Sequence, residues 1–226
     1  MANLLRGDIT IEGLIMRLIA VVIALTVHEF AHGFVSYRLG DRTAQFDGRL
    51  SFNPMKHIDP IGFLLIVLVG FGWAKPVMVN PRNLRKPKRD MALISAAGPV
   101  SNFILAFVAL LFMHPLLTLG IGLDWAIGGV FVMYYVIMFL ITLIGMNIML
   151  GVFNLLPLPP LDGSKILAVF LPNHLYWRYT GFHHGFIILL VLIIAPGNIL
   201  GRILSPFIGV IYLGLYTLVR WIYFFL

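Results

Sequence analysis

Five long stretches of the chain are almost continuously apolar. Four of them are longer than 20 residues and the fourth along the chain has 17, and about 20 is the length that an α-helix needs to cross the hydrocarbon core of a bilayer. The pattern therefore predicts an all-α polytopic membrane protein with about five transmembrane helices, in a range of four to six. The predicted spans are Ile11 to Tyr37, Met91 to Leu117, Trp125 to Leu155, Tyr179 to Ala195 and Ile203 to Leu226.

Two shorter patterns lie between the first two spans. The apolar run from Ile61 to Gly72 is too short to cross a membrane as a helix, so it predicts a re-entrant or interfacial element. Between Arg42 and Phe52, apolar and polar residues alternate with the period of a strand, which predicts a half-buried strand or a hairpin turning at Asp47-Gly48. This strand either caps the bundle or offers an edge that an extended peptide joins, with Ala44 and Phe46 as substrate-binding residues.

Composition supports the membrane interpretation and limits the domain organisation. Hydrophobic residues make up 60% of the chain and charged residues 11%, whereas about a quarter of a soluble domain is charged. We expect one membrane-embedded domain over 1–226, with its motifs in about 11–170 and C-terminal helices in about 174–226. The chain has no cysteine, so a metal site would use His, Asp, Glu or water. The first apolar run is too long for a cleavable signal peptide.

Basic residues are distributed unevenly. Ten of the 16 Lys and Arg residues lie between Arg38 and Arg89, and the loop from Thr118 to Asp124 has none. By the positive-inside rule, the first region is cytoplasmic and the N-terminus lies outside, in a plasma-membrane protein with its active site toward the cytoplasm. The net charge of +7 requires no nucleic-acid partner, because basic loops beside spans satisfy topology and anionic lipid.

The first predicted span contains the sequence His28-Glu29-Phe30-Ala31-His32. Histidines four residues apart share one helix face, and Glu29 lies about 100° around the helix from His28. This arrangement suits two metal ligands with a base beside them. The alternative is a helix whose polar residues face a packed bundle, although ionisable groups within the membrane are costly and usually functional.

A third ligand is needed, because catalytic zinc sites use three protein ligands and a water. Asp162 ends the proline-rich segment from Asn154 to Gly163, which follows an apolar span and cannot be a regular helix. Irregular backbone at membrane depth is tolerated where it lines a protein-covered cavity. Asp162 is therefore the candidate ligand, and the alternative is a helix N-cap or an ordinary Asp-Gly turn.

Three motifs together resemble the site-2 protease family of intramembrane zinc metalloproteases, in its short prokaryotic form without a PDZ domain. They are HEFAH, AAGPVSN at 96–102 and NLLPLPPLDG at 154–163. The resemblance implies that His28, His32 and Asp162 bind one zinc ion and that Glu29 is the general base. It places Asn154 near the active site and equates Asn102 with the asparagine of the family's GPxxN pattern, for which we expect a role in substrate binding.

The implied reaction is hydrolysis of peptide bonds in transmembrane proteins or remnant signal peptides. Zinc would lower the pKa of a bound water to about 7, and Glu29 would take its proton. Asn154 either donates a hydrogen bond to the oxyanion or makes an inter-helix hydrogen bond. A metal transporter, or a metal-binding membrane protein without protease activity, is the alternative function. Oligomeric state does not follow from the sequence.

Overall fold

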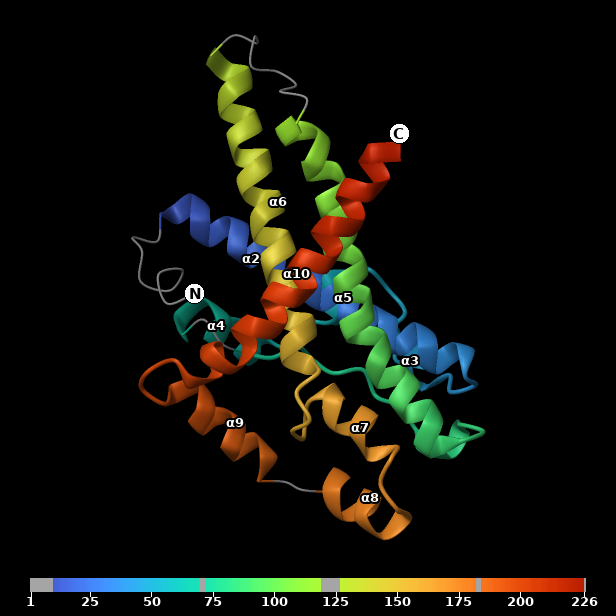
Figure 1. Cartoon of the computed structure of the whole chain (residues 1–226). Coiled ribbons are helices and arrows are strands. Elements are labelled where there is room, and N and C mark those ends of the chain that lie inside the picture. Colours follow the sequence, from blue (N-terminus) through green and yellow to red (C-terminus); the bar gives the residue numbers. More distant parts are fainter. Residues whose placement is uncertain (1–9, 70–71, 119–126, 182–183, 226) are drawn as a thin grey trace.

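The computed structural model describes residues 10–69, 72–118, 127–181 and 184–225, and this part of the chain is mainly helical (Figure 1). The α-helices are α2 (Ile11–Arg38), α3 (Thr43–Phe46), α4 (Pro60–Val69), α5 (Pro87–Thr118), α6 (Ile127–Asn154), α7 (Asp162–Ala168), α8 (Asn173–Thr180), α9 (Gly185–Ile194) and α10 (Ile199–Phe225). Two single 3-10 turns, η1 (Pro54–Lys56) and η2 (Pro81–Asn83), lie between α3 and α5.

Four of the described helices, α2, α5, α6 and α10, are long and apolar enough to cross a membrane. They match four of the predicted spans, although the expected start of the third span at Trp125 and the basic-free loop 118–124 fall largely outside the described residues. The remaining predicted span corresponds to α8 and α9, which pass the same test only as a pair bent by 51°. The all-α membrane fold with four or five spans is thus confirmed.

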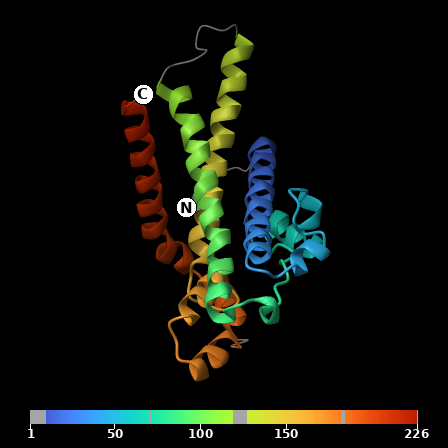
Figure 2. The same cartoon turned by 90° about the vertical axis from the view of Figure 1, so that its right-hand side faces the viewer.

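The core is formed where α2, α5 and α6 pack against one another, and α10 packs on α5 and α6 (Figures 1 and 2). Small residues at these contacts, such as Ala20 on α2 and Ala106 on α5, are completely buried. Small side chains let helix backbones approach closely, which is how helices associate within lipid. Leu110 and Ile148 fill the space between α5 and α6.

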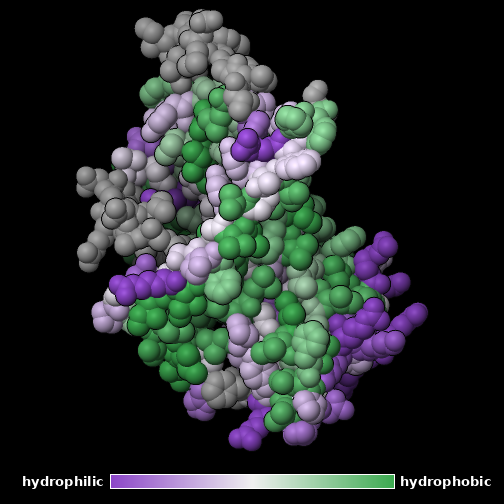
Figure 3. All heavy atoms as spheres, in the orientation of Figure 1, coloured by the Kyte–Doolittle hydropathy of each residue, from purple (hydrophilic) through white to green (hydrophobic). Residues whose placement is uncertain are grey.

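The outer surface is apolar over much of its area. On α10, Phe207, Val210, Leu213 and Trp221 are each at least 60% exposed, which would be unfavourable in water. Hydrophobic residues cover much of the face in Figure 3, whereas hydrophilic residues gather near α3 and the start of α5. This distribution fits a multi-pass protein in a bilayer, with its polar end where the basic residues concentrate.

The segment that contains α4 leaves and returns to the same place. Ile58 and Ala74 form an antiparallel bridge, and the Lys75 amide donates to the carbonyl of His57 at 2.8 Å. A Cβ on Gly62 would lie 2.1 Å from the carbonyl oxygen of Trp73, so this crossing requires a glycine. The chain then continues as an extended strap, residues 72–80, which runs from the α4 segment toward η2.

The predicted strand over 42–52 does not form. Thr43–Phe46 make one helical turn, in which Ala44 is fully buried against Gly33 of α2 and Phe46 is largely exposed. The strand edge expected there is therefore absent, and substrate binding by Ala44 and Phe46 stays a prediction. The predicted turn is present, since Gly48 adopts a positive φ of 65°.

Asp41 explains why this region folds as turns. Its carboxylate is completely buried and accepts hydrogen bonds from the hydroxyls of Ser36 and Thr43, the amides of Thr43 and Asn80, and the side-chain amide of Asn83. Burial alone would raise the pKa of Asp41, but the hydrogen bonds from Thr43, Asn83 and Asn80 lower it below its ordinary value. One carboxylate thus joins the end of α2, α3 and the end of the strap.

We expect Asp41→Ala to destabilise this polar end by about 2–3 kcal/mol, because hydrogen bonds to a charged group are among the stronger ones. Thermal unfolding of the purified protein and limited proteolysis within 72–83 would measure the effect. Asp47→Ala, which changes an exposed carboxylate six residues away, is the matched control.

The stabilisation should also depend on pH. A carboxyl with a lowered folded-state pKa stabilises the fold fully above its unfolded value, near 3.8, and loses this effect as the pH falls through the folded value. The difference between wild type and Asp41→Ala should therefore shrink below about pH 4. A constant difference down to pH 2 would contradict this assignment.

Candidate metal centre

Helix α2 carries the two histidines on one buried face. His28 and His32 lie ten and six residues before the end of the helix at Arg38, so they are about 15 Å and 9 Å from that end along the axis. Both residues are buried, and their Nε2 atoms are 3.0 Å apart. The predicted helical spacing is confirmed.

Asp162 lies beside both histidines, although it is about 130 residues further along the chain. Helix α6 ends at Asn154, the proline-rich segment turns back, and α7 begins at Asp162. Its Oδ2 lies 3.2 Å from Nε2 of His28 and 3.1 Å from Nε2 of His32. The N-cap alternative is not realised, because Leu161 holds the cap position and no side chain caps the helix.

The outer nitrogen of each imidazole is held by an acceptor on α5. Nδ1 of His32 lies 2.7 Å from the carbonyl oxygen of Ile94, and Nδ1 of His28 lies 2.7 Å from Oδ1 of Asn102. A carbonyl oxygen only accepts, so His32 donates from Nδ1. The Asn102 amide nitrogen faces the carbonyl of Ala24 at 3.1 Å, which leaves Oδ1 to accept from His28.

These hydrogen bonds decide what the inner nitrogens can do. With both protons on Nδ1, neutral imidazoles present lone pairs at both Nε2 atoms, and these meet a carboxylate oxygen at 3.0–3.2 Å. Two protonated imidazoles would instead face each other at 3.0 Å as like charges. A divalent cation relieves either repulsion, and two imidazoles with a carboxylate are a known catalytic zinc set. The residues present therefore fit zinc.

Gly98 leaves space for the imidazole rings of His28 and His32. A Cβ at this position would lie 2.5 Å from Cε1 and 2.6 Å from Nε2 of His28, and 2.6 Å from Cε1 of His32. Contacts under 3 Å with two buried rings would displace both candidate ligands. The glycine of the AAGPVSN stretch is thus required where α5 crosses the metal centre.

Asn147 extends the hydrogen-bond network to a third helix. Its Oδ1 accepts from Nδ2 of Asn102 at 2.8 Å, and its own Nδ2 donates to the carbonyl of Leu143 at 2.8 Å. Both asparagine side chains are completely buried. Asn102 therefore contacts His28 and lies out of reach of solvent. Asn147 is not among the residues predicted from the sequence, where its one visible signal is an amide within an apolar span.

Glu29 lies beside the histidines and is held by the strap. The amide of Val77 donates to Oε2 of Glu29 at 3.0 Å, and the side chain of Glu29 is about nine-tenths buried. Nothing in the side chain of Val77 could have signalled this contact, because a backbone N–H makes it. The carboxylate retains its second oxygen for another partner.

Asn154 is placed differently from the other candidates. Its Nδ2 donates to the carbonyl of Leu150 at 3.0 Å, within its own helix, and its side chain is only partly buried. This contact is neither of the two interactions predicted for it. A role at the oxyanion would require the side chain to turn away from Leu150.

The helical membrane fold and the buried His, His and Asp group define a class, the membrane-embedded zinc metalloproteases, with one zinc ion per chain. The model of peptidase family M50, to which the site-2 proteases belong, matches residues 16–121 and 120–194. The chain belongs to this family. The resemblance seen in the three motifs is thereby confirmed, as is the assignment as a metalloprotease.

Curated relatives share this description. The chain is 42% identical to "Putative zinc metalloprotease YwhC" of Bacillus subtilis, over 79% of this chain and 80% of the relative. It is 28% identical to Rip2 of Mycolicibacterium smegmatis, over 77% of this chain and 65% of the relative. The chain is also 29% identical to the Methanocaldococcus jannaschii protein MJ0611, over 74% of this chain and 75% of the relative. No solved structure shows significant similarity to the chain.

We expect Gly98→Ala to lower the zinc content of the purified protein severely, because the added methyl group meets both imidazole rings. Gly145→Ala is the matched control, since a Cβ at that helical glycine has no atom within 4 Å. Zinc measured per mole of protein by elemental analysis tests the prediction. Full zinc occupancy in Gly98→Ala would show that the rings move aside without cost.

Proposed function

We propose that this protein is an intramembrane zinc endopeptidase, built as one membrane-embedded domain, which hydrolyses peptide bonds in or near transmembrane segments of its substrates. The observation that supports this most is the meeting of Nε2 of His28, Nε2 of His32 and Oδ2 of Asp162 inside a membrane-spanning bundle. These residues are the proposed zinc ligands. The two histidines lie about 9–15 Å from the end of α2, which supports a reaction below the membrane surface.

In the proposed reaction, the zinc ion and Glu29 have different chemical roles. When bound, zinc supplies a Lewis acid that acidifies water and polarises a peptide carbonyl. Glu29 accepts the proton of the attacking water and then delivers it to the leaving amine. The Val77 amide holds one oxygen of Glu29 in place, which leaves the other oxygen free to accept the proton.

The strap offers a role in handling the substrate. A transmembrane helix has its peptide groups hydrogen-bonded internally, so it must unwind before its carbonyl can react. The strap itself is extended and contacts Glu29 directly, so an unwound stretch of substrate would lie beside an extended backbone at the site. Re-entry of the α4 segment into the bilayer, proposed from its returning path, would bring this backbone to membrane depth.

The topology follows from the same features. Residues 38–89 carry most of the basic charge and connect the site-bearing end of α2 to the start of α5. We assign this polar end to the cytoplasm and the protein to the plasma membrane. Zinc chemistry would then take place nearer the cytoplasmic face, on single-span proteins or remnant signal peptides.

Glu29→Gln should retain the fold and the zinc, because glutamine keeps an oxygen that can accept from the Val77 amide. Without a proton acceptor, cleavage should fall by roughly a hundredfold to ten-thousandfold. The measurement is turnover of a model single-span substrate in liposomes, with zinc content determined in parallel. Glu12→Gln, at the opposite end of α2, is the control; undiminished turnover by Glu29→Gln would exclude the mechanism.

Asn147→Ala should weaken zinc binding by at most roughly tenfold, because Asn147 bonds to Asn102 and not to a ligand, and losing a direct partner of a metal ligand costs roughly tenfold to a hundredfold. The variant leaves one amide hydrogen of Asn102 unpaired, which loosens the acceptor for His28. Competition with a chelator gives the zinc affinity, and turnover should recover when zinc is saturating. Thr142→Val, which removes a bond within the same helix at a partly buried position, should bind zinc as wild type does.

A further inference from the structure

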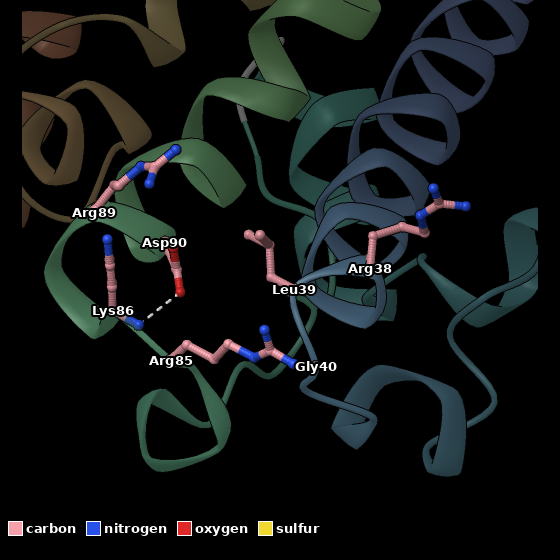
Figure 4. Close-up of a pocket in the computed structure, with 7 residues that line it drawn as sticks. All are labelled: Arg38, Leu39, Gly40, Arg85, Lys86, Arg89 and Asp90. Atoms are coloured by element: carbon pink, nitrogen blue, oxygen red, sulfur yellow. Dashed lines mark hydrogen bonds between the residues drawn. The ribbon is translucent and has the colours of Figure 1, made fainter.

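A basic cavity of about 360 Å³ lies between the C-terminal end of α2 and the start of α5 (Figure 4). One side is lined by Arg38 at the end of α2 and by Leu39 and Gly40 in the turn after it. The other side is lined by Arg85, Lys86, Arg89 and Asp90. The cavity is separate from the metal centre, because it shares no residue with it. No activity described above uses it.

Its charge is strongly positive and unbalanced. In the described part of the chain, Arg85, Lys86 and Arg89 form no salt bridge. The single carboxylate at the cavity, Asp90, is buried and accepts from the backbone amide of Lys86 at 2.9 Å. Apart from Arg38, three basic residues therefore line a concave space with one acid, which favours an anionic ligand.

The side chains of the cavity differ in direction. In Figure 4, the guanidinium of Arg85 extends toward Gly40 across the opening, and Leu39 lies between the two groups of residues. Arg38 also borders the cavity, but its guanidinium points away and lies 5.9 Å from the ring centre of Phe34. The ligand site thus combines two arginines and a lysine with one apolar side chain.

The position of the cavity points to phosphate. It lies where two candidate spans meet the polar end of the molecule, because α2 ends at Arg38 and α5 begins at Pro87. Arginine forks match phosphate oxygens in two-bond geometry, and basic pockets beside spans bind lipid headgroups. A headgroup would place its phosphate among the cations and its glycerol beside Leu39.

We propose that this cavity binds a phosphate group and thereby clamps α2 to α5. These two helices also supply the histidines and their outer acceptors, Ile94 and Asn102, so a ligand that joins them steadies the metal centre. Binding of phosphate is independent of the proposed function. Stimulation of cleavage by the bound group rests on the proposed function and is measured separately.

The test compares two sources of the group on the full-length zinc protein. Native mass spectrometry counts phosphatidylglycerol retained from mixed micelles with phosphatidylcholine, and thermal unfolding follows added inorganic phosphate against chloride at constant ionic strength. The variant is Arg85→Gln/Lys86→Gln/Arg89→Gln. The matched control is Arg42→Gln/Lys56→Gln/Arg82→Gln, which removes three exposed charges from the same region outside the cavity.

We expect a roughly tenfold or greater loss of phosphatidylglycerol affinity in the cavity variant and little change in the control. Stabilisation by inorganic phosphate that disappears only in the cavity variant would also support the site and would identify free phosphate as its ligand. Equal responses of the two triple variants to both probes would overturn the proposal. If the triple variant does not retain zinc, the single variant Arg85→Gln replaces it in the test, and we expect an intermediate loss of phosphatidylglycerol affinity.

Phosphatidylglycerol should in addition raise turnover of the single-span substrate by wild type and control, but not by the cavity variant. If the lipid is retained but turnover does not change, the proposal that the bound group clamps α2 to α5 is overturned, and the proposal that the cavity binds phosphate stands. Absence of turnover in every sample, with retention unchanged, would instead count against the proposed protease function. The two failures are therefore distinguishable.

Discussion

Two hydrogen bonds from imidazole nitrogens to acceptors on α5 determine what this site can bind. Because Ile94 presents a carbonyl and Asn102 presents its amide oxygen, both histidines carry their protons on the outer nitrogen. The inner nitrogens are then directed at Asp162 as lone pairs. This arrangement requires α5 to lie close to α2, which the absence of a side chain at Gly98 permits.

Burying the side-chain amides of Asn102 and Asn147 costs free energy. Hydrogen bonds to these amides offset that cost. Asn102 and Asn147 lie completely inside an apolar bundle, where an unpaired amide would be unfavourable by a few kcal/mol. Their four described hydrogen bonds reach α2, α5 and α6, so three spans are set in register by polar contacts at one level. Apolar packing alone would allow these helices to slide.

The sequence was sufficient for whatever depends on side-chain identity and spacing. Apolar run lengths predicted the spans, and HEFAH with Asp162 predicted the ligand group although about 130 residues separate its halves. It did not predict contacts made by backbone groups, because residue type does not reveal that the Ile94 carbonyl and the Val77 amide take part in the site. The strand prediction failed because alternation over 42–52 ignored Asp41, whose bonds to distant Asn80 and Asn83 favour turns.

The polar groups of the protein follow the seam between α2 and α5. At one level the seam holds His28, His32 and their acceptors, and about 9 Å beyond His32 it opens into the basic cavity at the end of α2. Both halves of the seam belong to the same two helices, so a change of angle between them at the charged end would alter the separation of Ile94 from His32. A metal centre whose histidines lie on one span and their outer acceptors on another is therefore sensitive to whatever occupies the surface where those spans end.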